Sequence, residues 1–278
     1  MTSTAAKAPA LEARALDVRY PGAAAPAVSG VSLVIPHGSI TAIIGANGSG
    51  KSTLLRALGR LSPPTGGAVL LDGRDIARLP AREVARGLGI LPQAPVAPDG
   101  LTVGDLVARG RDPHRRWFEQ WSTSDEAVVR RALAQTGMES LAGSRIDELS
   151  GGQRQRAWIA MALAQQTGVL LLDEPTTYLD LVHQLDVLDV VARLHSDHGV
   201  TVVMVLHDLT MAARYADRII AMRDGEVVAD GTPLEVVTPR VLERVFELVA
   251  DVVHDAAGRP VVIPQRRAEP RGGIEPPL

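Results

Sequence analysis

The amino-acid sequence predicts an α/β fold with a parallel-sheet core, an antiparallel β subdomain and a helical insertion subdomain. Three short, continuously apolar segments, at 40–45, 169–173 and 201–208, have the composition of strands buried on both faces, which is typical of a parallel sheet. Between the last two, leucines and valines of 180–199 recur at helical spacing. The order strand, helix, strand predicts a unit in which both strands belong to one sheet.

The N-terminal part of the chain predicts the antiparallel strands. After a mobile tail at 1–10, short segments with alternating apolar residues occur at 15–20 and 31–35, each next to turn residues. A third apolar segment at 68–73 follows the Pro- and Gly-rich turn 63–67. We expect these segments to pair in a small antiparallel sheet.

The remainder of the chain predicts a helical insertion, a hairpin and a tail. Residues 101–165 are helix-patterned without strand signals, so we place an inserted helical subdomain at about 94–165. Segment 218–231 alternates around Asp224-Gly225, a hairpin signal that we place after the sheet. The domain then covers 11–265, and the Pro-, Gly- and charge-rich residues 266–278 are expected to be disordered.

Composition excludes several classes of function. The 278 residues suffice for one large domain or two small ones, and a net charge of −3 does not favour binding to nucleic acid through bulk charge. The absence of cysteine excludes disulfides, iron–sulfur clusters and thiol catalysis. We see no secretory signal and no apolar segment of membrane-spanning length, and therefore expect a soluble cytoplasmic chain. Of 29 basic residues, only Lys7 and Lys51 are lysine.

The segment GANGSGKS at 45–52 matches the phosphate-binding pattern G-x-x-x-x-G-K-[ST]. It follows a predicted strand and opens a predicted helix, so its backbone N–H groups and the helix dipole favour a triphosphate. Lys51 is expected to bridge the β- and γ-phosphates and the Ser52 hydroxyl to ligate Mg²⁺. A chance glycine-rich turn is the alternative. The expected phosphate-binding residues are Gly45, Ala46, Asn47, Gly48, Ser49, Gly50, Lys51, Ser52 and Thr53.

The strand-like segment VLLLDE at 169–174 ends in two carboxylates. In a nucleotide site, Asp173 is placed to hold the Mg²⁺ shell and Glu174 to polarise the attacking water as general base. The alternative is an exposed acidic strand end.

A second anion-binding helix start occurs in LSGGQ at 149–153, where Ser150 is a good N-cap. A triphosphate held by 45–52 has its opposite face free, so a head-to-tail dimer with a second copy of the chain would complete the site. A simple capped helix is the alternative. The residues expected to close the partner's site are Ser150, Gly151, Gly152 and Gln153.

These three motifs, in this order and spacing, resemble the nucleotide-binding subunits of ABC transporters over roughly 11–265. The resemblance implies a RecA-like P-loop NTPase core that binds ATP and Mg²⁺. It implies that Gln93 senses Mg²⁺ and the attacking water, and that His207 contacts the γ-phosphate. It also implies that Asp180 crosses the dimer interface and that Tyr20 stacks on adenine. Taken singly, a loop glutamine, a strand-end histidine and a tyrosine near a turn each have an ordinary structural alternative.

The resemblance assigns two sets of functional residues. The expected catalytic residues are Glu174, His207, Gln93 and Lys51. The expected metal ligands are Ser52, Gln93 and Asp173.

Segments 108–114, 150–167 and 172–189 are similar to the ATPases of ferric-siderophore, haem and vitamin B12 importers, and most similar to the ferric-siderophore members. The chain departs from them at Asp112, where an aromatic residue is common. This similarity implies a peripheral ATPase on the cytoplasmic face of the membrane. Its partners would be permease subunits and, indirectly, an extracytoplasmic substrate-binding protein, with no nucleic acid.

Two alternatives remain. In the first, the importer carries haem, cobalamin or another nutrient. In the second, the chain is a non-transport ABC ATPase. The single phosphate-binding loop and the absence of a heptad pattern argue against the second.

A basic and aromatic cluster in the helical insertion is either a docking surface for the membrane partner or a solvated basic face. Its residues are Arg109, Arg111, His114, Arg115, Arg116, Trp117, Phe118 and Trp121.

Overall fold

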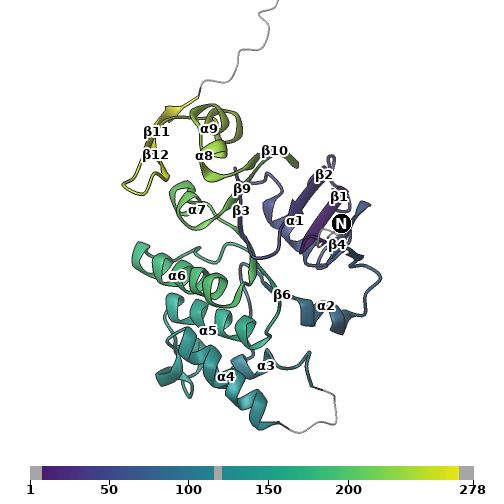
Figure 1. Ribbon diagram of the computed structural model, residues 1–278, viewed down its shortest axis with the longest axis vertical. Helices are drawn as coiled ribbons and strands as arrows, with labels where there is room; N and C mark the ends of the chain where they lie inside the picture. Colours follow the sequence, from purple (N-terminus) through teal and green to yellow (C-terminus); the bar gives the residue numbers. More distant parts are fainter. Residues whose placement is uncertain (1–7, 116–120, 269–278) are drawn as a thin grey trace, which may run out of the picture.

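The computed structural model describes residues 8–115 and 121–268, and its core is a six-stranded sheet in the order β10–β9–β3–β8–β7–β6 (Figure 1). All neighbouring strands of this sheet are parallel except the antiparallel pair β9 and β10. The strands are β3 (Ile40–Gly45), β6 (Leu88–Leu91), β7 (Val169–Leu172), β8 (Thr201–Val205), β9 (Arg218–Arg223) and β10 (Glu226–Gly231). The predicted parallel core is confirmed, with β3, β7 and β8 buried along their whole length.

Two strands of this sheet differ from the sequence-based expectation. Segment 218–231 is a hairpin, but its first strand, β9, pairs in parallel with β3 inside the sheet. Its four central residues are buried, so the alternation expected there was wrong. The four-residue strand β6 was missed, because it is too short to show a period.

The predicted antiparallel sheet is confirmed, with strand order β2–β1–β4–β5. Its strands are β1 (Leu11–Val18), β2 (Val28–Ile35), β4 (Gly66–Leu71) and β5 (Arg74–Asp75). Helix α1 (Lys51–Leu58) buries Leu54, Leu55 and Leu58 in a cluster that joins this sheet to one face of the central sheet. Burial of these side chains against two sheets fixes the helix that begins at the phosphate-binding loop.

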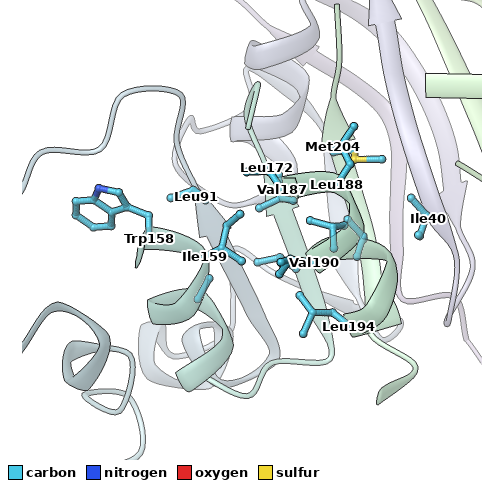
Figure 2. Close-up of a cluster of buried hydrophobic side chains, with 14 of the residues drawn as sticks. Ile40, Leu91, Trp158, Ile159, Leu172, Val187, Leu188, Val190, Leu194 and Met204 are labelled. Atoms are coloured by element: carbon cyan, nitrogen blue, oxygen red, sulfur yellow. The ribbon is translucent and has the colours of Figure 1, made fainter. Parts of the chain in front are cut away.

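Helices α5 (Gly151–Ala164), α6 (Leu181–His198) and α7 (Leu209–Tyr215) pack against the other face of the central sheet. Helices α3 (Val103–Arg109) and α4 (Thr123–Gln135) pack in turn against α5. Figure 2 shows Ile159 of α5 and Val187 and Leu188 of α6 in one buried cluster with Leu172 and Met204 of the sheet. The insertion predicted at 101–165 is helical in its described residues, with two short 3₁₀ turns, Glu139–Leu141 and Ile146–Glu148.

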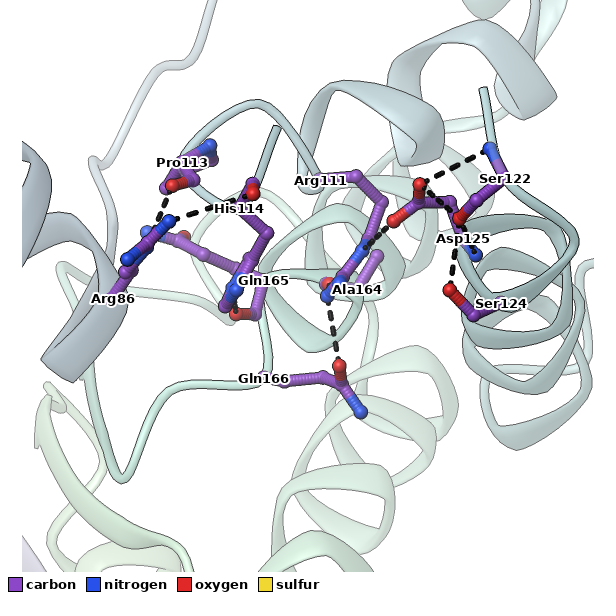
Figure 3. A network of polar contacts seen from close by, with 10 residues as sticks. All are labelled: Arg86, Arg111, Pro113, His114, Ser122, Ser124, Asp125, Ala164, Gln165 and Gln166. Atoms are coloured by element: carbon purple, nitrogen blue, oxygen red, sulfur yellow. Dashed lines mark hydrogen bonds and ion pairs between the residues drawn. The ribbon is translucent and has the colours of Figure 1, made fainter. Parts of the chain in front are cut away.

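A buried ion pair anchors this helical subdomain (Figure 3). Arg111 Nε donates to Asp125 Oδ1 at 2.9 Å, and Arg111 Nη1 donates to the carbonyl of Ala164 and to Gln166 Oε1, both at 2.8 Å. Arg111 is 7% exposed, so it belongs neither to a docking surface nor to a solvated face, and the expectation for this residue was wrong.

Neighbouring contacts tie the same region to helix α2 (Ala81–Gly87). Gln165 Nε2 donates to the carbonyl of Ala85 at 2.6 Å, and Arg86 Nε donates to that of Pro113 at 2.8 Å. Of the remaining cluster residues, Arg115 lies over the ring of Trp121, whereas Arg116, Trp117 and Phe118 lie outside the described residues.

The C-terminal unit contains α8 (Pro233–Val236), α9 (Pro239–Phe246), β11 (Leu248–His254) and β12 (Pro260–Arg267). Strands β11 and β12 form a separate hairpin, in which Leu248 pairs with Arg267 and Val249 with Arg266. Arg266 and Arg267 were expected in a disordered tail and instead end a strand, because this long-range pairing satisfies their backbone. The expected tail at 269–278 lies outside the described residues. Across 8–115 and 121–268, none of the helices combines the length and the apolar character needed to span a membrane.

Candidate functional site

The loop between β3 and α1 needs glycine because other backbone segments approach it closely. A Cβ atom at Gly45 would lie 2.3 Å from the carbonyl oxygen of Met222, and one at Gly50 would lie 2.2 Å from that of Ala27. Both distances are far below van der Waals contact, so a side chain at either position would displace the loop. The central sheet and the β1–β2 connection therefore hold the phosphate-binding loop from two sides.

Lys51 lies inside this loop and is 5% exposed. Its Nζ donates to the carbonyl oxygens of Gly45 at 3.0 Å and Ala46 at 2.9 Å. Burial lowers the pKa of Lys51, and the nearby carboxylates of Glu174 and Asp173 oppose that shift. The ammonium is thus held where a ligand phosphate in the loop would meet it.

Glu174 is the centre of a polar cluster that follows strand β7. His207 Nε2 lies 2.8 Å from its Oε1, Thr177 Oγ1 donates to its Oε2 at 3.0 Å, and Gln93 Nε2 donates to the same oxygen. The Glu174 side chain is 10% exposed. Its φ is +53°, a left-handed conformation that is costly for a residue with a side chain and that concentrates at functional sites.

The carboxylate of Asp173 is buried and accepts no hydrogen bond within the described residues. The residue is 2% exposed, and Arg56 Nε, 3.4 Å from Oδ2, makes an ion contact only. Buried carboxylate oxygens normally have partners, so this site fits the water shell of a cation. Ser52 and Gln93 line the neighbouring cavity, and their hydroxyl and amide oxygens are of the hard type that Mg²⁺ prefers.

One open cavity of about 730 Å³ collects most of the site residues predicted from the sequence. Its volume is in the range of small-molecule sites. The lining includes Tyr20, Asn47, Gly48, Gly50, Lys51, Ser52, Thr53, Gln93, Glu174 and His207. The Tyr20 hydroxyl and Thr53 Oγ1 are 3.1 Å apart, and the ring is 43% exposed, so it remains open to stack on a base. Ala46 and Ser49 line a second cavity, on the side of the loop that faces the C-terminal unit.

The LSGGQ segment and Asp180 do not reach this cavity. Ser150 caps α5: its Oγ accepts the Gln153 N–H at 3.3 Å, and Gln153 Oε1 accepts the Ser150 N–H at 3.0 Å. Asp180 caps α6 and accepts the N–H of His183 at 2.9 Å; this bond and the contact with the His183 ring lower the pKa of Asp180. The predicted binding residues therefore fall into two separate groups within one chain.

Close packing joins the members of the second group. A Cβ atom at Gly152 would lie 2.5 Å from Cδ2 of His183, and one at Gly151 would lie 3.6 Å from Cδ2 of Leu179. Neither His183 nor the Glu174 partner Thr177 was predicted from the sequence. The segment Glu-Pro-Thr-Thr directly after VLLLD was the available signal for Thr177.

Known proteins of similar sequence are ATP-binding proteins of transport systems. A family model described as ABC transporter matches residues 28–177. The achromobactin transport ATP-binding protein of Dickeya dadantii is 48% identical over 263 residues, 94% of this chain and 97% of the relative. The ferric enterobactin transport ATP-binding protein of Escherichia coli is 50% identical over 241 residues, 86% of this chain and 89% of the relative. A cobalamin import ATP-binding protein of Halobacterium salinarum is 40% identical over 253 residues, 91% of this chain and 63% of the relative.

Solved structures show the same fold. A metal-chelate type ABC transporter in an inward-facing conformation matches with a TM-score of 0.79 and 27% identity over 92% of this chain and 97% of the other. A dimeric bacterial ABC transporter cassette matches with a TM-score of 0.72 and 30% identity over 80% of this chain and 98% of the other. The chain therefore belongs to the family of ABC transporter ATP-binding proteins.

Proposed function

We propose that the chain is the ATP-hydrolysing subunit of an importer for ferric-siderophore complexes, bound to permease subunits at the cytoplasmic face of the membrane. The main observation behind this proposal is that one cavity, which Tyr20 also lines, is shared by four predicted catalytic residues: Lys51, Gln93, Glu174 and His207. The identity of about half of all residues to siderophore importer subunits supports the cargo.

The lining of the cavity offers partners for both the adenine and the phosphates of ATP. The exposed ring of Tyr20 offers a stacking surface for adenine, and the amides of loop 45–52 with the Lys51 ammonium offer donors for the phosphates. Residues Ser52, Gln93 and Asp173 would hold Mg²⁺. When bound, the ion neutralises charge that develops on the β- and γ-phosphate oxygens.

Glu174 is placed to orient the water that attacks the γ-phosphate in line. Gln93 and Thr177 donate to its carboxylate and His207 Nε2 lies 2.8 Å from its Oε1, so the carboxylate is held in place to accept a proton from that water. His207 is half-exposed at the cavity and can turn toward the γ-phosphate when the site is filled. Lys51 stabilises the negative charge of the transition state.

A second copy of the chain would complete the site. The Ser150–Gln153 segment begins a helix outside its own chain's cavity, and the amides of Gly151 and Gly152 take no part in its capping bonds, so this helix start is available to a triphosphate bound by another chain. A head-to-tail dimer would complete the nucleotide sites of both copies at once. The dimeric cassette among the structural neighbours supports this arrangement.

The substitution Glu174→Gln tests the enzymatic part of the proposal. It keeps shape and removes the base, so we expect ATP binding and dimer formation to persist while hydrolysis falls by at least about 100-fold. Glu139→Gln, at an exposed position outside the cavity, is the matched control and should keep full activity. Full turnover in Glu174→Gln would overturn the assignment of the base.

The cargo is tested in a deletion strain under iron limitation, supplied with single ferric siderophores, haem or cobalamin. We expect lost ferric-siderophore uptake, restored by the natural chain and not by Glu174→Gln. Unimpaired siderophore uptake would overturn the preferred cargo. Loss of cobalamin uptake in its place would favour the cobalamin alternative, which the relative from Halobacterium salinarum supports.

A further inference from the structure

Three large apolar side chains stand exposed around the start of α6. Tyr178 is 95% exposed, Leu181 is 59% exposed and Val182 is 67% exposed. We call these three residues the α6 patch. Side chains of this size, gathered in five consecutive positions beside a functional site, indicate a surface that a partner covers.

A cavity of about 430 Å³ lies on the other side of the phosphate-binding loop from the β7 and β8 ends, between that loop and the C-terminal unit. Loop residues 46–49 form one wall, and Val245, Phe246 and Leu248 form an apolar wall. Arg223 and Arg267 also line it, and both are paired with Glu247, at 3.2 and 2.7 Å. Asp224, which is paired with Arg223 at 3.2 Å, and Glu247 also line the cavity, so its charges balance one another, and the wall of Val245, Phe246 and Leu248 is where an apolar side chain would make contact.

The α6 patch is rigidly joined to the LSGGQ segment. Gly152 packs against His183 so closely that a Cβ atom would lie 2.5 Å from the ring, and Gly151 lies against Leu179. Leu179 lies within the five positions that carry the patch, and His183 directly follows them. Wherever the Ser150–Gln153 segment docks, the patch therefore docks with it.

The packing of the α6 patch against the LSGGQ segment indicates what occupies the cavity, on the basis of the proposed head-to-tail dimer. In that dimer the Ser150–Gln153 segment of one copy meets loop 45–52 of the other. Loop residues 46–49 are also a wall of the second cavity, so the α6 patch of the first copy arrives beside that cavity. We propose that Leu181 and Val182 of each copy enter the cavity of the other copy, between its phosphate-binding loop and its C-terminal unit.

The proposal gives the C-terminal unit a role in closing the dimer. Residues 245–248 and Arg267 lie outside the segment 28–177 that the family model matches. Because a two-fold axis repeats the contact, each dimer would bury two patches, one on each C-terminal unit. Apolar burial at both positions would stabilise the ATP-bound dimer beyond the contacts made through the nucleotide.

Cysteine cross-linking tests the contact directly, because the natural chain has no cysteine. The double variant Val182→Cys/Arg267→Cys is prepared in the Glu174→Gln background, saturated with ATP and treated with a short bismaleimide. We expect a covalent dimer on a denaturing gel only with ATP. The matched control pairs Val182→Cys with Leu234→Cys, an exposed position of the same C-terminal unit outside the cavity, and should remain monomeric on the gel. Each single-cysteine variant is run alongside.

Size-exclusion chromatography of the same samples separates the two ways of failing. A dimer that forms with ATP but cross-links no better than the control would overturn this inference and leave the head-to-tail dimer standing. Absence of any ATP-dependent dimer would overturn the proposed dimer and this inference together.

The energetic contribution is measured with Leu181→Ser/Val182→Ser in the Glu174→Gln background. Both positions are exposed in the free chain, so the substitutions leave its folding intact. We expect the dissociation constant of the ATP-bound dimer to rise by at least about tenfold. Leu234→Ser is the control, and an equal effect of the two variants would contradict the proposal.

Discussion

Replacing Asp125 by alanine should severely destabilise the protein. Asp125 is 6% exposed and Arg111, its partner at 2.9 Å, is 7% exposed. Without the carboxylate, the buried guanidinium keeps only the carbonyl of Ala164 and the side chain of Gln166 as acceptors. Breaking a buried pair costs about 3–5 kcal/mol, and losing the capping interaction with Ser122 adds about 1 kcal/mol.

The measurement is the free energy of unfolding from urea titration followed by circular dichroism. The matched control is Asp147→Ala, which removes the partner of Arg145 from a pair at 2.6 Å with side chains 49% and 51% exposed. An exposed pair of this kind contributes far less to stability than a buried one, because solvent screens its charges. In addition, Arg111→Met/Asp125→Leu should recover most of the stability, because apolar residues carry no buried charge.

The dependence of stability on acid pH provides a second test of the Arg111–Asp125 pair. The hydrogen bonds from Ser122 lower the pKa of Asp125, and Arg111 adds to that shift against the opposing effect of burial. A lowered carboxylate pKa stabilises the fold above the ordinary value of 3.8 and loses that contribution as the pH falls through the folded value. The difference between the natural chain and Asp125→Ala should therefore narrow in strong acid. Equal losses for Asp125→Ala and Asp147→Ala at neutral pH would refute this reasoning.

Three further substitutions probe the nucleotide site. Lys51→Arg should lower ATP turnover by at least about 100-fold, because two loop carbonyls hold a compact ammonium that a broad planar guanidinium does not reproduce. An unchanged kcat in steady-state ATPase kinetics would contradict this. Tyr20→Ala should raise the KM for ATP by about tenfold with little change in kcat, because one base-stacking contact is lost. An unchanged KM would reject the stacking role. Gly152→Ala should displace His183 and abolish ATP-dependent dimer formation in size-exclusion chromatography, whereas Gly143→Ala, which meets open space and lies outside the predicted binding residues, should be tolerated. Equal behaviour of the two would count against the packing argument.

Local patterns were sufficient to predict the core of the fold. Continuous apolar segments identified β3, β7 and β8, because strands covered on both faces need apolar side chains at every position. The spacing of loop 45–52 identified the phosphate-binding loop, because its chemistry lies in a few consecutive backbone groups. The lone lysine of that loop, in a chain that otherwise uses arginine almost throughout, marked the same position.

Long-range contacts decided the features that the sequence analysis missed or misplaced. Strand β6 is too short to show a period, and β9 joins the sheet only through pairing with β3. Strand β12 is polar at its end, and its pairing with β11 across a turn makes it a strand. Such pairings depend on the tertiary structure, so no local pattern could reveal them.

The candidate site likewise has features that local patterns predict and features that depend on long-range contacts. Its polar residue types, and the ends of the predicted strands where they stand, are legible in the amino-acid sequence. Folding in three dimensions brings Gln93, Thr177 and His207 onto the carboxylate of Glu174, and leaves that of Asp173 buried with no hydrogen bond from the residues that the structure describes. The physical reason is that hydrogen bonds and burial act over a few ångströms in space, between residues that the chain separates by as many as 81 positions.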